Sequence, residues 1–159
     1  MSGRGAFAVL VGVLGAAIAM FGCGGGGGSD TAVAESSISK AQYVKQAEAV
    51  CKKGNEEMEA DFAVFYRENE DVKKPTESLY VNLFEEVLEP NVSTEIEELR
   101  KLDVPKGDAA QVETMLNARE ESLTIAESEP KAIIENSKKV FGKASRLAGE
   151  YGLNDCANR

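Results

Sequence analysis

Acidic side chains are the residues of this sequence whose number and spacing could do chemistry. They gather in three groups, which are Glu56, Glu57, Glu59 and Asp61, then Glu85, Glu86 and Glu89, and then Glu95, Glu97 and Glu98. Carboxylates on facing helices can hold a di-iron centre, but such sites also use Glu-x-x-His motifs, and this sequence contains no histidine. A calcium loop needs oxygen ligands that alternate around a glycine turn, and none of the groups has this arrangement. We therefore interpret all three groups as solvated helix faces, because they interleave with apolar stripes.

The usual nucleophiles and cofactor motifs are also missing from the sequence. Without histidine there is no Ser-His or Cys-His nucleophile pair, and the commonest zinc ligand is absent. The consecutive glycines at 24–28 are not followed by the Lys-Ser/Thr of a phosphate-binding loop. We predict no catalytic residue, no cofactor and no metal site, and we expect a protein that is not an enzyme. A catalytic carboxylate pair stays open as the least favoured alternative, because it depends on a cleft and on separated pKa values.

The N-terminus indicates export. Arg4 precedes an apolar run over residues 6–21, which is shorter than the about 20 residues of a membrane-spanning helix and is typical of a secretory signal peptide. The run ends in Met20-Phe21-Gly22-Cys23, which resembles the lipobox of bacterial lipoproteins. This resemblance implies cleavage after residue 22 and a lipid on Cys23, which would anchor the chain to the extracytoplasmic face of the cell membrane. The alternative is an uncleaved membrane anchor in which the cysteine is incidental.

Two further cysteines are left once Cys23 is assigned to lipidation. Disulfides persist outside the cytoplasm, so Cys51 and Cys156 pair most simply with each other. The spacing is far from the C-x-x-C of redox-active pairs, which favours a structural cross-link. Because the cross-link closes a long loop, the chain-entropy model gives it a stabilising effect of about 4–5 kcal/mol.

Composition divides the chain into a leader, a tether and one domain. Residues 1–22 are the signal peptide, residues 23–37 are the lipidated cysteine and a glycine-rich flexible tether, and residues 38–159 are the domain. The formal net charge of −9 argues against nucleic acid as a partner, because nucleic-acid binding needs basic patches.

The domain has the apolar periodicity of helices throughout, and we predict an all-α antiparallel bundle of about four helices. Ser39 and Gln42 have the spacing of a capping box at the start of the first helix, which ends before Pro75. Its apolar residues fall on one face at gaps of three and four: Tyr43, Ala47, Val50, Cys51, Gly54, Met58, Phe62 and Phe65. The second helix, over about 75–102, is expected to be kinked or broken at Pro90.

The other two helices are predicted from start and stop signals. Asp108 and Gln111 are spaced to cap the third helix, whose stripe is the weakest, and we expect this helix to pack at the edge. Pro130 suits the first turn of the fourth helix, and Gly152 suits the left-handed residue that ends it. The stripe of the fourth helix is Ile133, Ile134, Val140, Phe141, Ala144, Leu147, Ala148 and Tyr151.

Short motifs along the domain resemble those of small secreted and lipid-anchored helical proteins of actinobacteria. The matching segments are Ile38-Ser39-Lys40-Ala41-Gln42-Tyr43, Ala49-Val50-Cys51, Val87-Leu88-Glu89-Pro90, Leu99-Arg100-Lys101-Leu102, Pro105-Lys106-Gly107-Asp108, and Tyr151-Gly152-Leu153 followed by Cys156. The resemblance implies lipoprotein-like export, a helical fold and pairing of the two cysteines. It implies no activity.

Two classes of function fit these features. The leading hypothesis is a cell-envelope lipoprotein that acts as a non-enzymatic binding or interaction module for an unknown envelope protein or ligand. The alternative is a small-ligand carrier with an apolar cavity between its helices. A packed interior would favour the first, and a roomy apolar cavity with converging polar groups would favour the second.

Overall fold

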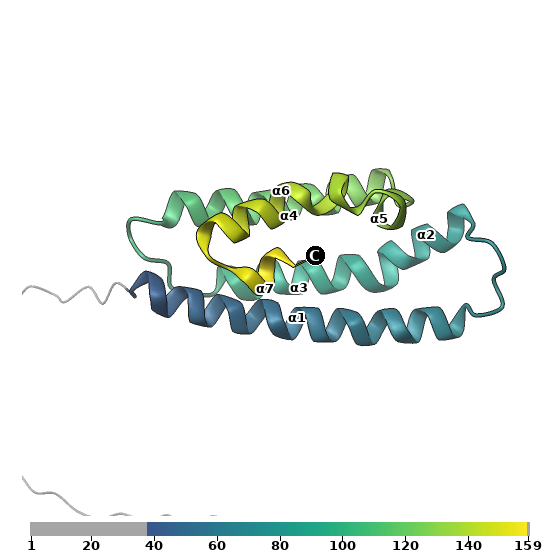
Figure 1. Ribbon diagram of the computed structural model, residues 1–159, viewed down its shortest axis with the longest axis horizontal. Coiled ribbons are helices and arrows are strands. Elements are labelled where there is room, and N and C mark those ends of the chain that lie inside the picture. Colours follow the sequence, from purple (N-terminus) through teal and green to yellow (C-terminus); the bar gives the residue numbers. More distant parts are fainter. Residues whose placement is uncertain (1–37, 159) are drawn as a thin grey trace, which may run out of the picture. The chain divides into compact units, whose positions relative to one another are not determined.

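The computed structural model describes residues 38–158, which are mostly helical with no strand among them (Figure 1). The elements in chain order are α1 (Lys40–Glu68), α2 (Glu77–Leu83), the π-helical segment η1 (Phe84–Leu88), α3 (Glu89–Arg100), α4 (Ala109–Ser128), α5 (Ala132–Glu135), α6 (Ser137–Tyr151) and α7 (Asn154–Ala157). The predicted signal peptide, the lipidation site Cys23 and the tether lie outside the described residues. Within residues 38–158, no helix is both long and apolar enough to cross a membrane.

The long helices run antiparallel, which confirms the predicted all-α bundle (Figure 1). α1 packs on α3, α3 packs on α4, and α4 packs on α6. α1 and α6 make little direct contact within the described region, and the short α7 packs against both of them. We call the face between α1 and α6 the α1–α6 seam. Three sides of the bundle are therefore closed by helix packing, and the fourth is filled by α7 along part of its length.

The first helix begins and ends where the sequence predicts. The Ser39 side chain accepts a hydrogen bond from the Gln42 backbone N–H at 3.3 Å, and the Gln42 side chain accepts one from the Ser39 N–H at 2.9 Å. This capping box satisfies backbone donors that the first helical turn leaves unpaired. The predicted stripe faces the interior, with these residues buried: Tyr43, Ala47, Cys51, Gly54, Met58 and Phe65.

The second helix is continuous through Pro90. At the position of the predicted kink or break, the helix changes locally from α to π type. The path runs from Glu77 to Arg100 through η1, in which the Glu89 N–H donates to the Phe84 carbonyl five residues earlier. Proline has no N–H and its ring crowds the carbonyl four residues before it. A π-helical turn immediately before Pro90 provides an alternative pairing for the backbone, which keeps the apolar stripe on one face.

Two predictions about the later helices are wrong. α4 is not at the edge, because it packs against both α3 and α6 and buries these residues: Val112, Met115, Leu116, Ala118, Arg119, Ser122 and Ala126. Its small side chains allow close packing, which a search for large apolar residues overlooks. Asp108 stands at the N-cap of α4 but its side chain makes no capping bond. Instead, its Oδ2 accepts a hydrogen bond from the Tyr151 hydroxyl at 2.7 Å.

The fourth helix is divided, which the sequence reasoning missed. Pro130 precedes only the single turn of α5, and Asn136 then leaves helical geometry with φ −150° and ψ 55°. The Asn136 side chain accepts a hydrogen bond from the Lys139 N–H at 3.3 Å and so caps the start of α6. As a result Ile134, which we expected on the buried stripe, is 49% exposed.

The chain reverses after α6 as predicted. Gly152 ends the helix with φ 105°, a conformation that residues with a side chain rarely adopt. The Leu153 N–H donates back to the Ala148 carbonyl at 2.9 Å, and the Leu153 side chain is fully buried. The reversal places α7 against α1, where Cys156 forms a disulfide with Cys51, their Cα atoms 5.0 Å apart. The predicted pairing is thereby confirmed.

The interior consists of two apolar clusters along the bundle. The disulfide-end core contains Tyr43, Ala47, Cys51, Leu99, Val112, Met115, Leu116, Ala148, Tyr151, Leu153 and Cys156. The groove-end core contains Met58, Phe65, Leu83, Phe84, Val87, Leu88, Val92, Ile96, Ala126, Ala132, Ile133 and Val140. Helices α1, α3, α4 and α6 contribute residues to both, so the two cores are successive layers of one bundle.

Candidate binding groove

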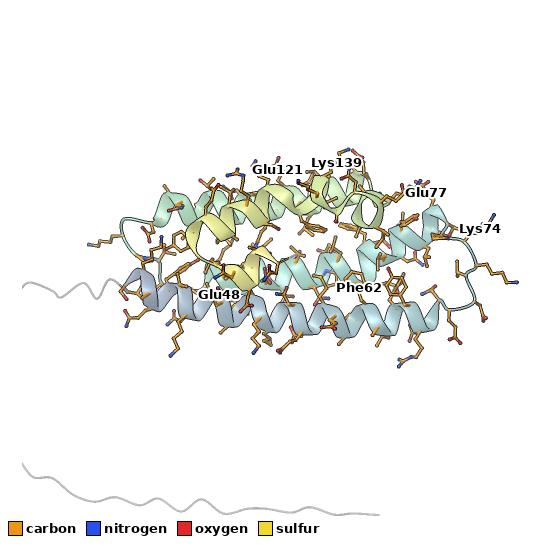
Figure 2. All side chains as sticks on the ribbon, viewed as in Figure 1. Glu48, Phe62, Lys74, Glu77, Glu121 and Lys139 are labelled. Atoms are coloured by element: carbon orange, nitrogen blue, oxygen red, sulfur yellow. A yellow bond between two sulfur atoms is a disulfide. The ribbon has the colours of Figure 1, made fainter. Side chains whose placement is uncertain are left out.

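An apolar groove of about 400 Å³ opens at the α1–α6 seam beside the groove-end core. Its lining residues come from α1, η1, α3, α5, α6 and the residue after α7: Asn55, Met58, Glu59, Phe62, Leu88, Val92, Ile133, Ile134, Ser137, Phe141 and Asn158. Figure 2 shows Phe62 rising from α1 toward the helices packed on it. The lining presents mostly carbon to solvent, which is unusual for a surface hollow and typical of a binding site.

The groove exists because α7 covers only part of the seam. α7 ends at Ala157, and the next residue, Asn158, forms one wall of the groove. Beyond this point no helix of residues 38–158 lies between the apolar side chains of α1 and α6. The division of the fourth helix adds to the opening, since it turns Ile134 outward at the rim.

Polar contacts hold α7 against α1 next to the disulfide. The backbone N–H groups of Asn154 and Asp155 donate to the two carboxylate oxygens of Glu48, each at 2.7 Å. The Asn55 side chain donates to the Asp155 carbonyl at 2.8 Å. Glu48 lies on α1 below the turn that carries α7 (Figure 2). The end of the groove formed by Asn158 is therefore fixed by a covalent bond and by hydrogen bonds with two side chains of α1, of which Glu48 accepts and Asn55 donates.

A buried ion pair lies between the two cores. Arg119 on α4 and Glu95 on α3 are 3% and 2% exposed, and the Arg119 Nη1 lies 2.5 Å from the Glu95 Oε1. The Arg119 Nη2 also donates to the Cys156 carbonyl at 2.7 Å. Burial lowers the pKa of Arg119, and the Glu95 carboxylate opposes this shift by favouring the charged guanidinium. One guanidinium thus connects α3, α4 and α7.

The burial of Glu95 corrects one part of the sequence interpretation. The other members of the three acidic groups are exposed, as expected for solvated helix faces. Glu95 instead lies on the buried side of α3, three residues after Val92 and four before Leu99. The same spacing places Arg119 on the buried side of α4, four residues after Met115. A charged residue in phase with the stripe on each of two helices was the signal that could have revealed the pair.

Other surface hollows hold charged groups that are already paired or exposed. A polar hollow of about 360 Å³ lies near α5, where Lys139 pairs with Glu129 at 2.6 Å (Figure 2). A hollow between α1 and η1–α3 carries the carboxylates of Glu57, Asp61 and Glu86, and the Asp61 carboxylate accepts a hydrogen bond from the Asn91 side chain at 2.9 Å. Among residues 38–158, no group of three or more acidic or cysteine side chains has an arrangement that could hold a metal ion.

The interior next to the buried ion pair is tightly packed. A space of about 10 Å³ lined by Arg119, Ser122 and Cys156 among others is close to the volume of a single water probe. The Arg119 Nε is buried without an acceptor among the described residues, as the Tyr43 hydroxyl is without a hydrogen-bond partner in the disulfide-end core. The apolar volume available to a ligand lies in the open groove and not in this interior space.

The disulfide end contains a buried pair of tyrosines. Tyr43 and Tyr151 meet edge to face with ring centroids 5.7 Å apart, and the Lys40 ammonium lies 4.1 Å from the centre of the Tyr151 ring. Burial raises the pKa of Tyr151, and its hydrogen bond to the Asp108 carboxylate raises it further. Burial raises the pKa of Tyr43 as well. These contacts are those of a packed core and show no access for a ligand.

Comparisons with protein-family models, curated proteins and solved structures give no match for this chain.

Proposed function

We propose that this chain is a lipid-anchored protein of the cell envelope whose helical domain is a non-enzymatic binding module. The observation that carries the binding role is the apolar groove at the α1–α6 seam, which holds partly exposed Phe62, Phe141 and Ile134 in one hollow. Clustered apolar surface of this kind costs free energy in water, and proteins keep it where a partner covers it.

The location rests on the sequence of the N-terminus. The signal-like run at 6–21 and the lipobox-like residues 20–23 support export and lipidation of Cys23. The Cys51–Cys156 disulfide is consistent with an oxidising compartment, because such bonds are rare in reducing ones.

A small-ligand carrier is the second candidate, and the size of the groove favours it. A volume of about 400 Å³ lies within the range of small-molecule sites, which is roughly 300–1,000 Å³. Such sites bury most of their ligand, whereas this groove is open along the seam. We therefore place the carrier role second.

Site-directed cross-linking in the native envelope tests the binding role. A photo-reactive amino acid replaces Ile134 at the groove rim, and a matched chain carries it at Glu127, which is exposed on α4 outside the groove. We expect one discrete cross-linked species from position 134 and none of that mass from position 127. Mass spectrometry of the species separates a protein partner from a small ligand.

The outcome that would overturn the binding role is equal cross-linking from both positions, or none from position 134 in cells that express the chain at its natural level. Either result would mean that the groove is not occupied in the envelope.

A further inference from the structure

We propose that the groove binds an amphipathic α-helix of a partner protein, with a basic side chain of that helix beside Glu59. This inference rests on the proposed binding function and names the chemistry of the occupant. It depends on three observations, which are the helical turn already lying in the same seam, the spacing of the apolar wall residues and the charge of the rim.

The seam already accommodates a helix at its other end. α7 is a turn of helix that packs between α1 and α6, and the groove begins at Asn158, directly after it. The separation of α1 and α6 that admits α7 is thus present where the groove starts. A helix from a partner would lie in the seam beyond α7 and pack between α1 and α6 as α7 does (Figure 1).

The apolar residues of the α1 wall have helical spacing. α1 contributes Met58 and Phe62, four residues apart, which lie one above the other on its surface. The opposite wall is formed by Ile134 and by Phe141 of α6. Rows of this kind receive the side chains of a third helix at its i, i+3, i+4 and i+7 positions, which is how grooves between helices bind amphipathic helices.

The rim selects for positive charge. Glu59 is the one charged side chain among the described residues that line the groove, and it makes no ion pair within residues 38–158. The sequence as a whole carries a formal charge of −9, so the field around the groove also favours a cationic partner. An acyl chain carries no positive group to pair with Glu59. A small ligand of this kind also needs a site that encloses most of it, and this groove is open.

A designed peptide provides the probe. It is a Leu/Lys peptide of about 18 residues with leucines at i, i+3, i+4 and i+7, a length above that at which isolated helices are marginal, and it carries a photo-reactive residue on the apolar face. Its controls are a scrambled peptide of the same composition and a Leu/Glu peptide with the same stripe. The full lipidated chain is placed in phosphatidylcholine nanodiscs, and the peptide concentration for half-maximal cross-linking is measured.

We expect the Leu/Lys peptide to cross-link to groove residues and the scrambled and Leu/Glu peptides to need at least tenfold more. Ile134→Ser should raise the half-maximal concentration about tenfold, since it removes an apolar contact worth about one decade in affinity. Val64→Ser is its control, because Val64 is comparably exposed but lies outside the groove.

Charge reversal gives the sharpest test of the rim. Glu59→Lys should weaken the Leu/Lys peptide and improve the Leu/Glu peptide, whereas Glu127→Lys changes the net charge equally and should leave the preference as it was. Loss of binding by both peptides in Glu59→Lys with an unchanged circular dichroism spectrum would contradict the proposed role of charge.

Other occupants give different outcomes, and each overturns the helix proposal. A fluorescent fatty acid that binds in an Ile134-dependent way and displaces the peptide would assign the groove to lipid. A dimer in sedimentation equilibrium that Ile134→Ser dissociates would assign it to a second copy of this chain. Cross-links from a photo-reactive residue at position 134 to residues 24–37 of the same chain would assign the groove to the chain's own tether.

The two proposals fail in distinguishable ways. If position 134 cross-links in the envelope but the Leu/Lys peptide does not bind, the groove is a binding site for a different ligand. If the peptide binds but position 134 finds no partner in the envelope, the groove has the chemistry proposed but the binding function is wrong.

Discussion

The two ends of the bundle use the same helices in opposite ways. At the disulfide end, α7 lies between α1 and α6, Cys51 is bonded to Cys156, and the side chains of Tyr43 and Leu153 are fully buried. At the groove end the same seam is open, and Phe62 and Ile134 are in contact with solvent. Both ends have a buried apolar core, but the covalent cross-link and the polar contacts of α7 lie at one end only, and the apolar surface at the other end of the seam stays uncovered in the described region.

Removal of one partner of the ion pair between the cores should have the largest effect on the stability of the domain. Arg119→Met should lower the free energy of unfolding by about 3–5 kcal/mol, because Glu95 would be left charged or protonated in an apolar interior. Urea unfolding followed by circular dichroism measures the loss. The double variant Glu95→Leu with Arg119→Met is the control and should recover most of it; a double variant as unstable as the single one would show that the contact of Arg119 with the Cys156 carbonyl dominates.

Reduction of the disulfide should have a similar or slightly smaller effect. Because the bond closes a loop of about 105 residues, breaking it should lower the unfolding free energy by about 2–5 kcal/mol while the helix content is kept. Unfolding with and without reductant measures the difference. Thiol labelling of the denatured, unreduced chain should find no free thiol at either Cys51 or Cys156, and labelling of both would refute the cross-link.

A pair of apolar truncations sharpens the comparison of the two ends. Leu153→Ala, in the fully buried disulfide end, should cost about 2–5 kcal/mol, since it leaves a cavity in a packed core. Ile134→Ala, at the groove rim, should change stability by no more than about 0.5 kcal/mol. Equal losses in urea unfolding would mean that the groove end contributes to folding as much as the disulfide end does.

Alkaline pH should destabilise the disulfide end. Burial raises the pKa of both Tyr43 and Tyr151, so the folded state keeps protons that the unfolded tyrosines lose above their ordinary pKa of 10.0. Stability is therefore retained below about pH 10 and declines as the pH rises beyond it. The urea midpoint at about pH 8 and about pH 11 measures this decline. Tyr151→Phe should make it shallower, and an unchanged slope would contradict the assignment.

The anchor should have the smallest effect on folding. Cys23→Ala should release the protein from the membrane fraction or leave it unprocessed. The unfolding midpoint of the domain should stay the same, because the glycine-rich sequence of residues 24–37 offers few apolar side chains to bury. Fractionation and melting curves measure the two properties separately. Unchanged membrane association with normal processing would remove the basis for lipidation at Cys23.

The sequence alone was enough to predict the local features of this protein. The capping box at Ser39, the reversal at Gly152 and the buried stripe of α1 each depend on residues within one or two helical turns, so their physical causes are visible in short segments. The cysteine pairing was also predictable, because two cysteines allow one connection. The acidic groups were interpreted correctly except at Glu95.

The remaining features were decided by the tertiary structure. Glu95 and Arg119 are buried because α3 and α4 bring them together, and the fourth helix divides at Asn136 where a side-chain cap replaces helical bonding. The groove has no local signature, because its walls come from helices far apart in sequence and its end is set by where α7 stops after folding back onto α1. Short-range patterns report which face of a helix is apolar, but which part of that face stays uncovered depends on how all the helices pack together.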